Sequence, residues 1–222
     1  MMPELHRREA FTEPPDRLSA LALYERHAPC YDQETDWAAS DRARVVELLD
    51  VRPGETVIDV GCGTGLCFPL LMAGVGRQGR VVGVEQSIDM LGRAKERVDE
   101  SGWGNVELVL GSAEELRIPV VADAALFSFT HDVLRNEAAL ANVLAHLRPG
   151  GRVAAVGPMW APWWAPGMNL LIWYVTSDFV TTYEGFSEPW SHLARLVPNL
   201  SVARQALLGR YFAWGSLPEG GA

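Results

Sequence analysis

Residues 56–65, Thr-Val-Ile-Asp-Val-Gly-Cys-Gly-Thr-Gly, restrict the fold of this 222-residue chain more than any other segment. A short apolar run ends in three glycines at alternate positions, Gly61, Gly63 and Gly65, and an apolar stretch from Leu66 to Val75 follows. This order is typical of a buried strand, a tight turn and a helix whose first N–H groups are free to bind a ligand. An ordinary strand-to-helix turn is the alternative interpretation.

An acidic residue stands at the corresponding place in the next expected strand. Glu85 follows the apolar run Val81-Val82-Gly83-Val84. A carboxylate at the carboxyl end of a second parallel strand can accept hydrogen bonds from both hydroxyls of a ribose. The glycine turn and Glu85 together indicate a cofactor that carries a nucleoside.

The glycine spacing distinguishes between such cofactors. The dinucleotide fingerprint G-x-G-x-x-G requires a glycine where this chain has Leu66, so a nicotinamide dehydrogenase is the least favoured class. The pattern that is present, Asp59-x-Gly61-x-Gly63-x-Gly65, resembles motif I of the class I S-adenosylmethionine-dependent methyltransferases. Within that family the chain is most similar to the ubiquinone-biosynthesis and phospholipid N-methyltransferase-like branch. The ammonium and sulfonium of that cofactor suit an acidic wall containing Asp59.

Composition narrows the class of protein. With 48% hydrophobic and 21% charged residues, the chain is expected to be one soluble globular domain. A net charge of −9 disfavours a nucleic-acid substrate, which binds to basic surfaces. The cysteines Cys30, Cys62 and Cys67 lack metal-ligand spacing, so we expect reduced thiols, no metal and a cytoplasmic location. Residues 1–16 show no secretion signal and are expected to be frayed.

Strands and helices alternate after residue 50. We expect strands at 56–60, 80–85, 106–110, 124–129 and 152–157, helices at 66–75, 87–100 and 136–147, and a helix stop at 149–151. Amino-terminal helices are expected at 17–28 and, capped by Asp41, at 42–49. Later segments suggest a helix at about 167–180 and a hairpin of 201–208 and 210–216. This pattern predicts an α/β fold whose mostly parallel sheet has helices on both faces.

The resemblance implies a Rossmann-like methyltransferase fold with seven strands, closed by that antiparallel hairpin, over about residues 24–214. Residues 1–50 would form an amino-terminal arm and helical lid. Residues 51–222 would form the cofactor-binding core, with an aromatic-rich insert at about 158–190 that covers the substrate.

The resemblance also implies which residues hold S-adenosylmethionine, with S-adenosylhomocysteine as product. Backbone groups of the glycine turn would bind the methionine part, Asp59 its ammonium and Glu85 the ribose. Met90 would pack on the adenine, although a core position is the alternative. Ser112 replaces the family's usual aspartate at the adenine contact, which the N–H of Ala113 can still make. The full expected set is Tyr31, Asp59, Gly61, Cys62, Gly63, Gly65, Glu85, Gln86, Met90, Ser112, Ala113, Glu114, Phe129 and Thr130.

Catalysis and lid closure are assigned by the same resemblance. His131 matches a histidine at the floor of the substrate pocket and is the candidate general base, because its ordinary pKa suits proton removal near neutrality. Packing at a helix entry, with Asp132 as cap, is the alternative. Tyr31 would close over the cofactor, and His27 is a second candidate for a polar group near the methyl. Surface positions on a short helix are the alternative for both.

Trp160, Trp163 and Trp164 follow the fifth strand directly and are expected to bind substrate. A flat apolar or aromatic acceptor, or a cationic amine, would suit them. Core packing and contact with a membrane surface are the alternatives.

These observations predict methyl transfer to a nitrogen, oxygen or carbon atom of a small acceptor. Two other hypotheses stay open. The first is an enzyme that uses the cofactor's charge to promote a rearrangement or cyclisation without methylation. The second is a non-catalytic cofactor-binding subunit that folds around a partner.

Overall fold

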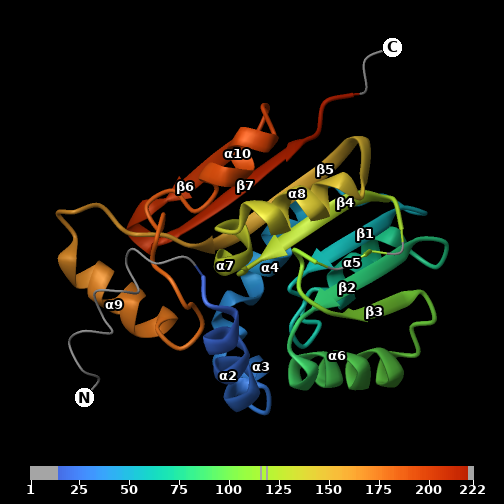
Figure 1. Cartoon of the computed structure of the whole chain (residues 1–222), viewed down its shortest axis with the longest axis horizontal. Helices are drawn as coiled ribbons and strands as arrows, with labels where there is room; N and C mark the ends of the chain where they lie inside the picture. Colours follow the sequence, from blue (N-terminus) through green and yellow to red (C-terminus); the bar gives the residue numbers. More distant parts are fainter. Residues whose placement is uncertain (1–14, 116, 119, 220–222) are drawn as a thin grey trace.

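The computed structural model describes residues 15–115, 117–118 and 120–219, and the expected fraying of residues 1–16 lies almost wholly outside this part. Seven strands in the described residues form one sheet in the order β3-β2-β1-β4-β5-β7-β6 (Figure 1). The strands are β1 (Thr56–Val60), β2 (Arg80–Glu85), β3 (Val106–Leu110), β4 (Ala122–Ser128), β5 (Leu147–Pro158), β6 (Ser201–Gln205) and β7 (Arg210–Ser216). Strands β1 to β5 are parallel, and β7 runs antiparallel to both β5 and β6. The Rossmann-like methyltransferase fold is confirmed.

Helices cover both faces of this sheet. The helical elements are α2 (Arg17–His27), α3 (Tyr31–Glu34), η1 (Asp36–Ala38), α4 (Ala39–Leu49), α5 (Phe68–Val75), α6 (Ile88–Ser101), α7 (His131–Leu134), α8 (Glu137–Ala145), α9 (Pro166–Thr176), α10 (Ser191–Leu196) and η2 (Ala206–Leu208). One core cluster joins α4, α5 and α6 to the sheet, and the other joins α7, α8 and α10 to its opposite face.

Strand β4 shows how alternating side chains supply both core layers. Ala124 and Leu126 pack in the cluster with α5, whereas Ala125 and Phe127 pack in the cluster with α8. Successive side chains of a strand point to opposite faces, so a strand covered on both sides is apolar throughout. This is why a continuous apolar run predicted a central strand correctly.

Most expected elements are confirmed, and three local expectations are wrong. Asp41 does not cap a helix, because α4 begins earlier, at Ala39, and the Asp41 carboxylate binds Arg210 of β7. The stop at 149–151 lies inside β5, which begins at Leu147 and pairs with β4 across a register shift. The late helix, α9, ends at Thr176 and not at Val180.

The sheet order reverses between β1 and β4, which brings the carboxyl ends of β1, β2 and β4 together. Strand β1 lies between β2 and β4, and their carboxyl ends face one edge of the sheet. In open α/β sheets, ligands bind at this point. Helices α2 and α3 lie beyond this edge, between α6 and α9 (Figure 1). In the described part of the chain, no helix is both long enough and apolar enough to cross a bilayer.

Candidate active site

The glycine turn after β1 packs too closely for side chains at two of its positions. Gly61 and Gly65 have φ angles of 63° and 80°, in the left-handed region that favours glycine. A Cβ atom on Gly61 would lie 2.7 Å from Thr130 Cγ2, and one on Gly65 would lie 2.5 Å from the Phe68 ring. The turn therefore approaches the end of β4 on one side and the start of α5 on the other.

Glu85 is buried beside this turn and accepts three backbone hydrogen bonds. Its carboxylate accepts from the N–H groups of Gln86 and Ser87 at 2.8 Å each and from Gly63 at 3.0 Å. Burial raises the pKa of Glu85, while the hydrogen bonds from Ser87, Gly63 and Gln86 oppose that rise. The acid at the end of β2 thus fixes the glycine turn at the end of β1.

A cleft at this edge of the sheet, here called the cofactor cleft, brings together most of the residues expected to hold a cofactor. They come from the ends of β1 to β4 and from α3 and α6. Those lining it are Tyr31, Gly61, Gly63, Glu85, Gln86, Met90, Ser112, Ala113, Glu114, Phe129 and Thr130, together with His131. Met90 lines this cleft and also lies beside the glycine turn, since its Cε is 3.4 Å from where a Cβ of Gly63 would stand.

Asp59 and Cys62 line an adjoining smaller cleft, and Gly65 lines neither. The Asp59 carboxyl is almost wholly buried, and its Oδ2 has no hydrogen-bond partner among the described residues. Burial raises the pKa of Asp59 to about 8, and the neighbouring charge of Glu85 adds to the rise. A positive ligand group beside Asp59 would stabilise its ionised form.

Arg42 was not predicted from the sequence. It is a buried residue of α4 that lines the smaller cleft with Asp59, and its guanidinium lies 5.9 Å from the centre of the Phe129 ring. One of its N–H groups donates to Thr35 Oγ1 at 2.8 Å. An arginine on an amphipathic helix is normally solvent-exposed, so no local pattern distinguishes Arg42 from other surface residues.

A second cleft, here called the acceptor cleft, adjoins the first and is mainly apolar. Side chains from α2, α3, the end of β4 and the segment after α9 line both clefts: Tyr24, Tyr31, Phe129, His131 and Phe179. The acceptor cleft continues to Trp37, Pro158, Val175 and Val180. Phe129 has a φ of 58°, uncommon for a bulky residue, and such strained backbone is concentrated at functional sites.

His131 stands between the two clefts. It is 4% exposed, and neither ring nitrogen has a hydrogen-bond partner among the described residues. Its ring centre lies 4.7 Å from that of Phe186 in an edge-to-face contact. Burial lowers the pKa of His131 to about 3, and the positive charge of Arg135 contributes. The imidazole is therefore neutral at physiological pH. Asp132 does not cap a helix; its carboxylate accepts from Thr181 instead.

The predicted lid residue Tyr31 lies beside the glycine turn, with its Cε1 4.0 Å from where a Cβ of Gly63 would stand. Asp32, next to it, accepts a hydrogen bond from Thr64 Oγ1 and pairs with Arg97 of α6. Arg97 Nε also donates to the carbonyl oxygen of Thr64 at 2.9 Å. These contacts attach α3 to the turn and to α6, and they hold Tyr31 at the cofactor cleft.

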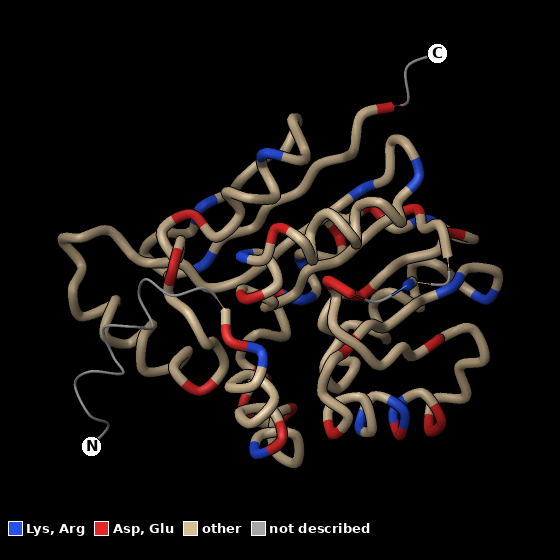
Figure 2. Tube along the Cα trace, viewed as in Figure 1, with Lys and Arg blue, Asp and Glu red and all other residues tan. Residues whose placement is uncertain are grey.

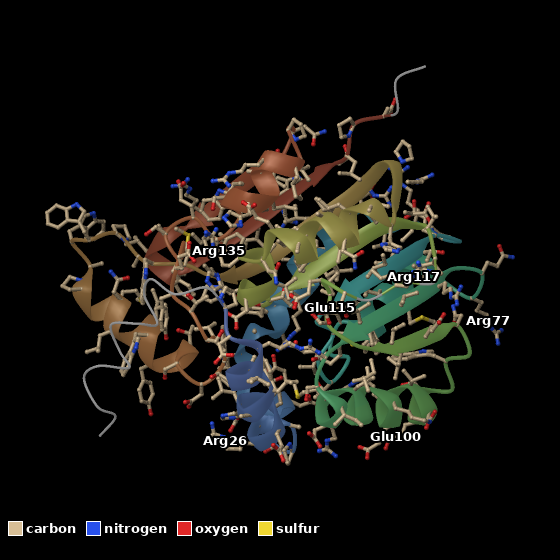
Figure 3. The ribbon with its side chains drawn as sticks, viewed as in Figure 1. Arg26, Arg77, Glu100, Glu115, Arg117 and Arg135 are labelled. Carbon is tan, nitrogen blue, oxygen red and sulfur yellow. The ribbon has the colours of Figure 1, made fainter. Side chains whose placement is uncertain are left out.

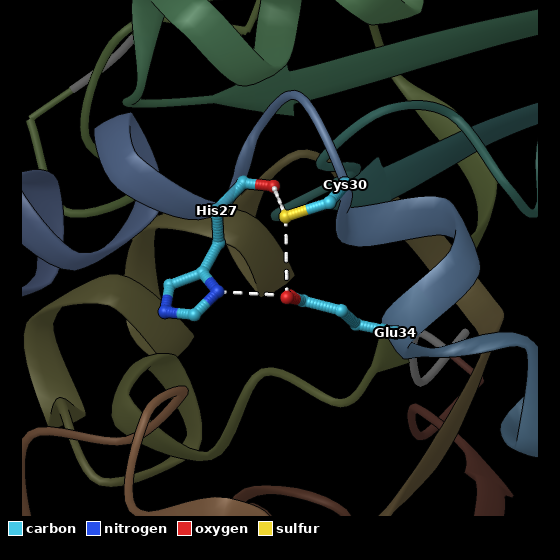
Figure 4. A group of neighbouring side chains, drawn as sticks. All are labelled: His27, Cys30 and Glu34. Carbon is cyan, nitrogen blue, oxygen red and sulfur yellow. Dashed lines mark hydrogen bonds and ion pairs between the residues drawn. The ribbon is translucent and has the colours of Figure 1, made fainter.

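His27 is engaged elsewhere, in a small cluster at the junction of α2 and α3 (Figure 4). His27 Nδ1 lies 2.8 Å from Glu34 Oε2, and the Cys30 thiol donates to Glu34 Oε1 at 3.1 Å. His27 lines none of the three clefts described above. The cluster holds α2 against α3, and its three residues are neighbours in space because that junction is tight. Cys30, Cys62 and Cys67 are unpaired in this structure.

The three predicted substrate-binding tryptophans lie in different surroundings. Trp160 stacks on Tyr183 and contacts Phe186, with ring centres 5.2 and 4.9 Å apart. Phe186 in turn contacts His131, so Trp160 supports the cleft from behind. Trp163 and Trp164 are 88% and 59% exposed and line none of these clefts. Their contact with substrate stays a prediction.

The described residues fit an adenosyl sulfonium cofactor. Buried polar atoms without partners gather at the carboxyl ends of β1 and β4, namely Asp59 Oδ2, Thr130 Oγ1 and both nitrogens of His131. Each such atom costs about 1–3 kcal/mol until a ligand supplies its partner. The site offers an acid for a cation, a second acid for a diol and apolar Met90 for a base. This fold and site define a Rossmann-like S-adenosylmethionine-dependent methyltransferase.

Comparisons with known proteins agree. A family model described as "Methyltransferase domain" matches residues 57–151. The demethylmenaquinone methyltransferase of Listeria welshimeri is 30% identical over 169 residues, which cover 71% of this chain and 70% of that protein. An uncharacterized 37.1 kDa protein in transposon TN4556 of Streptomyces fradiae is 35% identical over 130 residues, 57% of this chain and 36% of that one. The chain thus spans only about a third of the Streptomyces protein.

Solved structures show the same fold. The DhpI–SAH complex matches with a TM-score of 0.64 at 20% identity, covering 92% of this chain and 97% of that one. Because the Listeria welshimeri relative is 30% identical over 70% of its own length, the chain belongs to the class I S-adenosylmethionine-dependent methyltransferase family.

Proposed function

We propose that this protein transfers the methyl group of S-adenosylmethionine to a small, largely apolar or aromatic acceptor. The observation that carries the proposal is the wall shared by the two clefts. Tyr24, Tyr31, Phe129, His131 and Phe179 line both the cleft suited to the cofactor and the apolar cleft beside it. A donor in one and an acceptor in the other would meet at this wall.

The cofactor's charged end is assigned to two buried residues. Asp59 would hold the ammonium, and Arg42, which lines the same small cleft, would hold the carboxylate. Charge-assisted hydrogen bonds of this kind are each worth about 1.5–3 kcal/mol. When bound, the cofactor supplies a methyl group made reactive by a positively charged sulfur.

The cofactor's nucleoside would lie along the ends of β2 and β3. Glu85 Oε2 accepts one hydrogen bond from Gly63 and keeps a lone pair for a ribose hydroxyl. Met90 would pack on the adenine. Ser112 is buried just after β3. The carbonyl oxygen of Ala113 accepts a hydrogen bond from Asn142 Nδ2, and the Glu114 carboxylate accepts one from Asn136 Nδ2. These contacts give the loop a fixed edge for base recognition.

The acceptor cleft favours alignment over proton chemistry. Aromatic side chains exclude water from this cleft. Methyl transfer removes the positive charge of the sulfonium, so a dry site that aligns the methyl donor with the acceptor can supply most of the rate acceleration. Neutral His131 has a free nitrogen that can accept a hydrogen bond from an acceptor N–H or O–H group. Because burial lowers the pKa of His131, the imidazole takes up a proton from the acceptor only if the negative charge left on the acceptor stabilises the imidazolium.

The relative from Listeria welshimeri is named for demethylmenaquinone, a quinone, which supports a flat aromatic acceptor. The decisive experiment incubates the purified protein with S-adenosylmethionine and a reduced naphthoquinone that lacks the ring methyl. We expect S-adenosylhomocysteine and a product heavier by one methylene unit. If the protein binds S-adenosylmethionine but no apolar aromatic acceptor raises S-adenosylhomocysteine above the acceptor-free level, the proposed acceptor class is wrong.

A further inference from the structure

Helix α9 is apolar on all sides, yet only one of its faces is packed. Its sequence, Pro-Gly-Met-Asn-Leu-Leu-Ile-Trp-Tyr-Val-Thr, contains no charged residue. Ile172 packs in a small aromatic cluster with Tyr183 and Phe186. Leu170, Leu171 and Tyr174 are 66%, 52% and 71% exposed. A helix that is hydrophobic all round is normally buried, so its outer face lacks a partner.

The outer face continues into the turn that leads to the helix. Leu170, Leu171 and Tyr174 lie on one side of α9, because residues one turn apart share a face. Trp163 and Trp164 stand in the turn just before its first residue and are also exposed. These five residues are called the α9 patch. Single exposed apolar residues are common on proteins, whereas several on one helix and the turn before it are typical of an interaction surface.

The sequence segment that contains the patch also has no charged residue. No Asp, Glu, Lys or Arg occurs between Arg152 and Asp178. Figure 2 shows α9 without charged positions, in contrast to α6, which carries both acidic and basic residues. On other elements, charged side chains such as Arg26, Arg77 and Glu100 point into solvent (Figure 3).

Polar side chains near the patch face inward. Asn169 accepts from the N–H of Ala161 at 2.8 Å and donates to its carbonyl oxygen at 3.2 Å. Thr176 Oγ1 donates to the carbonyl oxygen of Ile172 within the helix. What remains outside is aliphatic and aromatic surface, with the polar tips of Trp163, Trp164 and Tyr174 as its few hydrogen-bonding groups.

We propose that the α9 patch docks on the surface of a lipid membrane with uncharged headgroups. The rim of a protein interface is polar, whereas no charged residue flanks this surface between Arg152 and Asp178. Tryptophan and tyrosine suit the boundary between headgroups and acyl chains, because each joins an apolar ring to a polar tip. The chain has a net charge of −9 and the patch has no basic residue, so we assign its docking to apolar insertion and not to attraction by anionic lipid.

The position of α9 gives this docking a consequence that rests on the proposed function. Val175 and Thr176, near the end of α9, line the acceptor cleft. A docked patch would therefore place the acceptor cleft one helix from the lipid phase, where an apolar acceptor is concentrated. The docking itself does not depend on the acceptor.

The test is co-sedimentation of the full chain with phosphatidylcholine vesicles. We expect binding that the double variant Trp163→Ser/Trp164→Ser weakens at least about tenfold, since burying each indole is favourable. Val121→Ser is the matched control, because Val121 is 73% exposed and precedes the amino end of β4, away from the carboxyl ends of the strands. It should leave binding unchanged. Adding phosphatidylglycerol should not strengthen binding. Melting temperatures of all variants verify that they are folded.

Three results would overturn the proposal. The first is a protein that stays in the supernatant at millimolar phosphatidylcholine. The second is a dimer in light scattering that the double variant disperses, since the patch would then bind a second copy of this chain. The third is vesicle binding that begins only after removal of residues 1–14, which would make that segment the occupant. The proposed function fails if the protein does not bind S-adenosylmethionine, and the docking proposal fails if it does not bind vesicles. The two measurements are independent, so the two failures are distinguishable.

Discussion

The Glu85 carboxylate accepts a hydrogen bond from the Gly63 N–H at 3.0 Å, so the acid of β2 is bonded to the glycine turn of β1. The sequence predicted Glu85 only as a partner for ribose. Because it also accepts from Gln86 and Ser87, it determines the shape of the site before any ligand arrives. Substitutions at Glu85 should therefore affect both cofactor affinity and local stability.

Glu85→Ala should weaken S-adenosylmethionine binding at least tenfold and also lower the free energy of unfolding. Three N–H groups lose their acceptor, and an unsatisfied buried group costs about 1–3 kcal/mol. Glu85→Gln, which keeps one acceptor oxygen, should be less destabilising. Calorimetry measures affinity and urea unfolding measures stability. Unchanged affinity in a folded Glu85→Ala protein would remove Glu85 from the cofactor site.

Binding of the cofactor should release a proton from Asp59. Burial and Glu85 raise the pKa of Asp59 to about 8 in the free protein, so the carboxyl is mostly protonated at pH 7. A bound ammonium favours the ionised form and lowers that pKa, so affinity should increase as pH rises toward 8. Calorimetry in buffers of different ionisation enthalpy detects the proton. Asp59→Asn should abolish the release, and a release that persists in this variant would assign it to another group.

Arg42→Met should weaken S-adenosylmethionine binding about tenfold or more, since the apolar stem remains and the positive charge is lost. Decarboxylated S-adenosylmethionine lacks the group assigned to Arg42. Its affinity should therefore be nearly the same for both proteins. If the substitution weakens both ligands equally, Arg42 supports the cleft and does not bind the carboxylate.

His131 should lower the free energy of unfolding in acid. Its pKa is lowered by burial to about 3, whereas an unfolded histidine has a pKa of about 6.5. Between these values the unfolded chain binds a proton that the folded chain does not, so stability falls as pH drops from about 6.5 to 3. Urea unfolding at pH 7 and pH 5 should show a smaller loss for His131→Gln than for the unaltered protein.

The same residue tests the need for a base. If His131 removes a proton, His131→Asn should lower kcat by about 10²–10⁴ with cofactor affinity nearly unchanged. A loss below about fivefold would mean that alignment alone drives transfer. Because the buried imidazole stays neutral, the rate should show no inflection near pH 6.5 from this group.

Truncation of Trp160 and of Trp163 should change the free energy of unfolding by very different amounts. Trp160 packs between Tyr183 and Phe186, so Trp160→Ala should lower the free energy of unfolding by about 3 kcal/mol. Trp163 is exposed, and Trp163→Ala should change stability by no more than about 0.5 kcal/mol. A large loss of stability for Trp163→Ala would place its indole in the core.

Local patterns in the sequence determined the frame of this protein. The runs ending at Val60 and Glu85 became strands with the predicted bounds, because apolar periodicity and glycine punctuation act over a few residues. The glycine spacing also identified the cofactor class, since backbone that approaches a ligand closely tolerates no side chain. The hairpin around Gly209 followed from the same kind of signal.

Contacts between distant segments were decided by the tertiary structure. Asp41 looked like a helix cap and instead binds Arg210, far along the chain. Arg42 was not singled out in the sequence, and it lines the cleft beside Asp59. Trp163 and Trp164 follow a strand that ends at the site, yet the chain turns outward before them. Periodicity states which face of an element is apolar. Only the packing of all elements together decides which apolar face meets the core, a ligand or the outside.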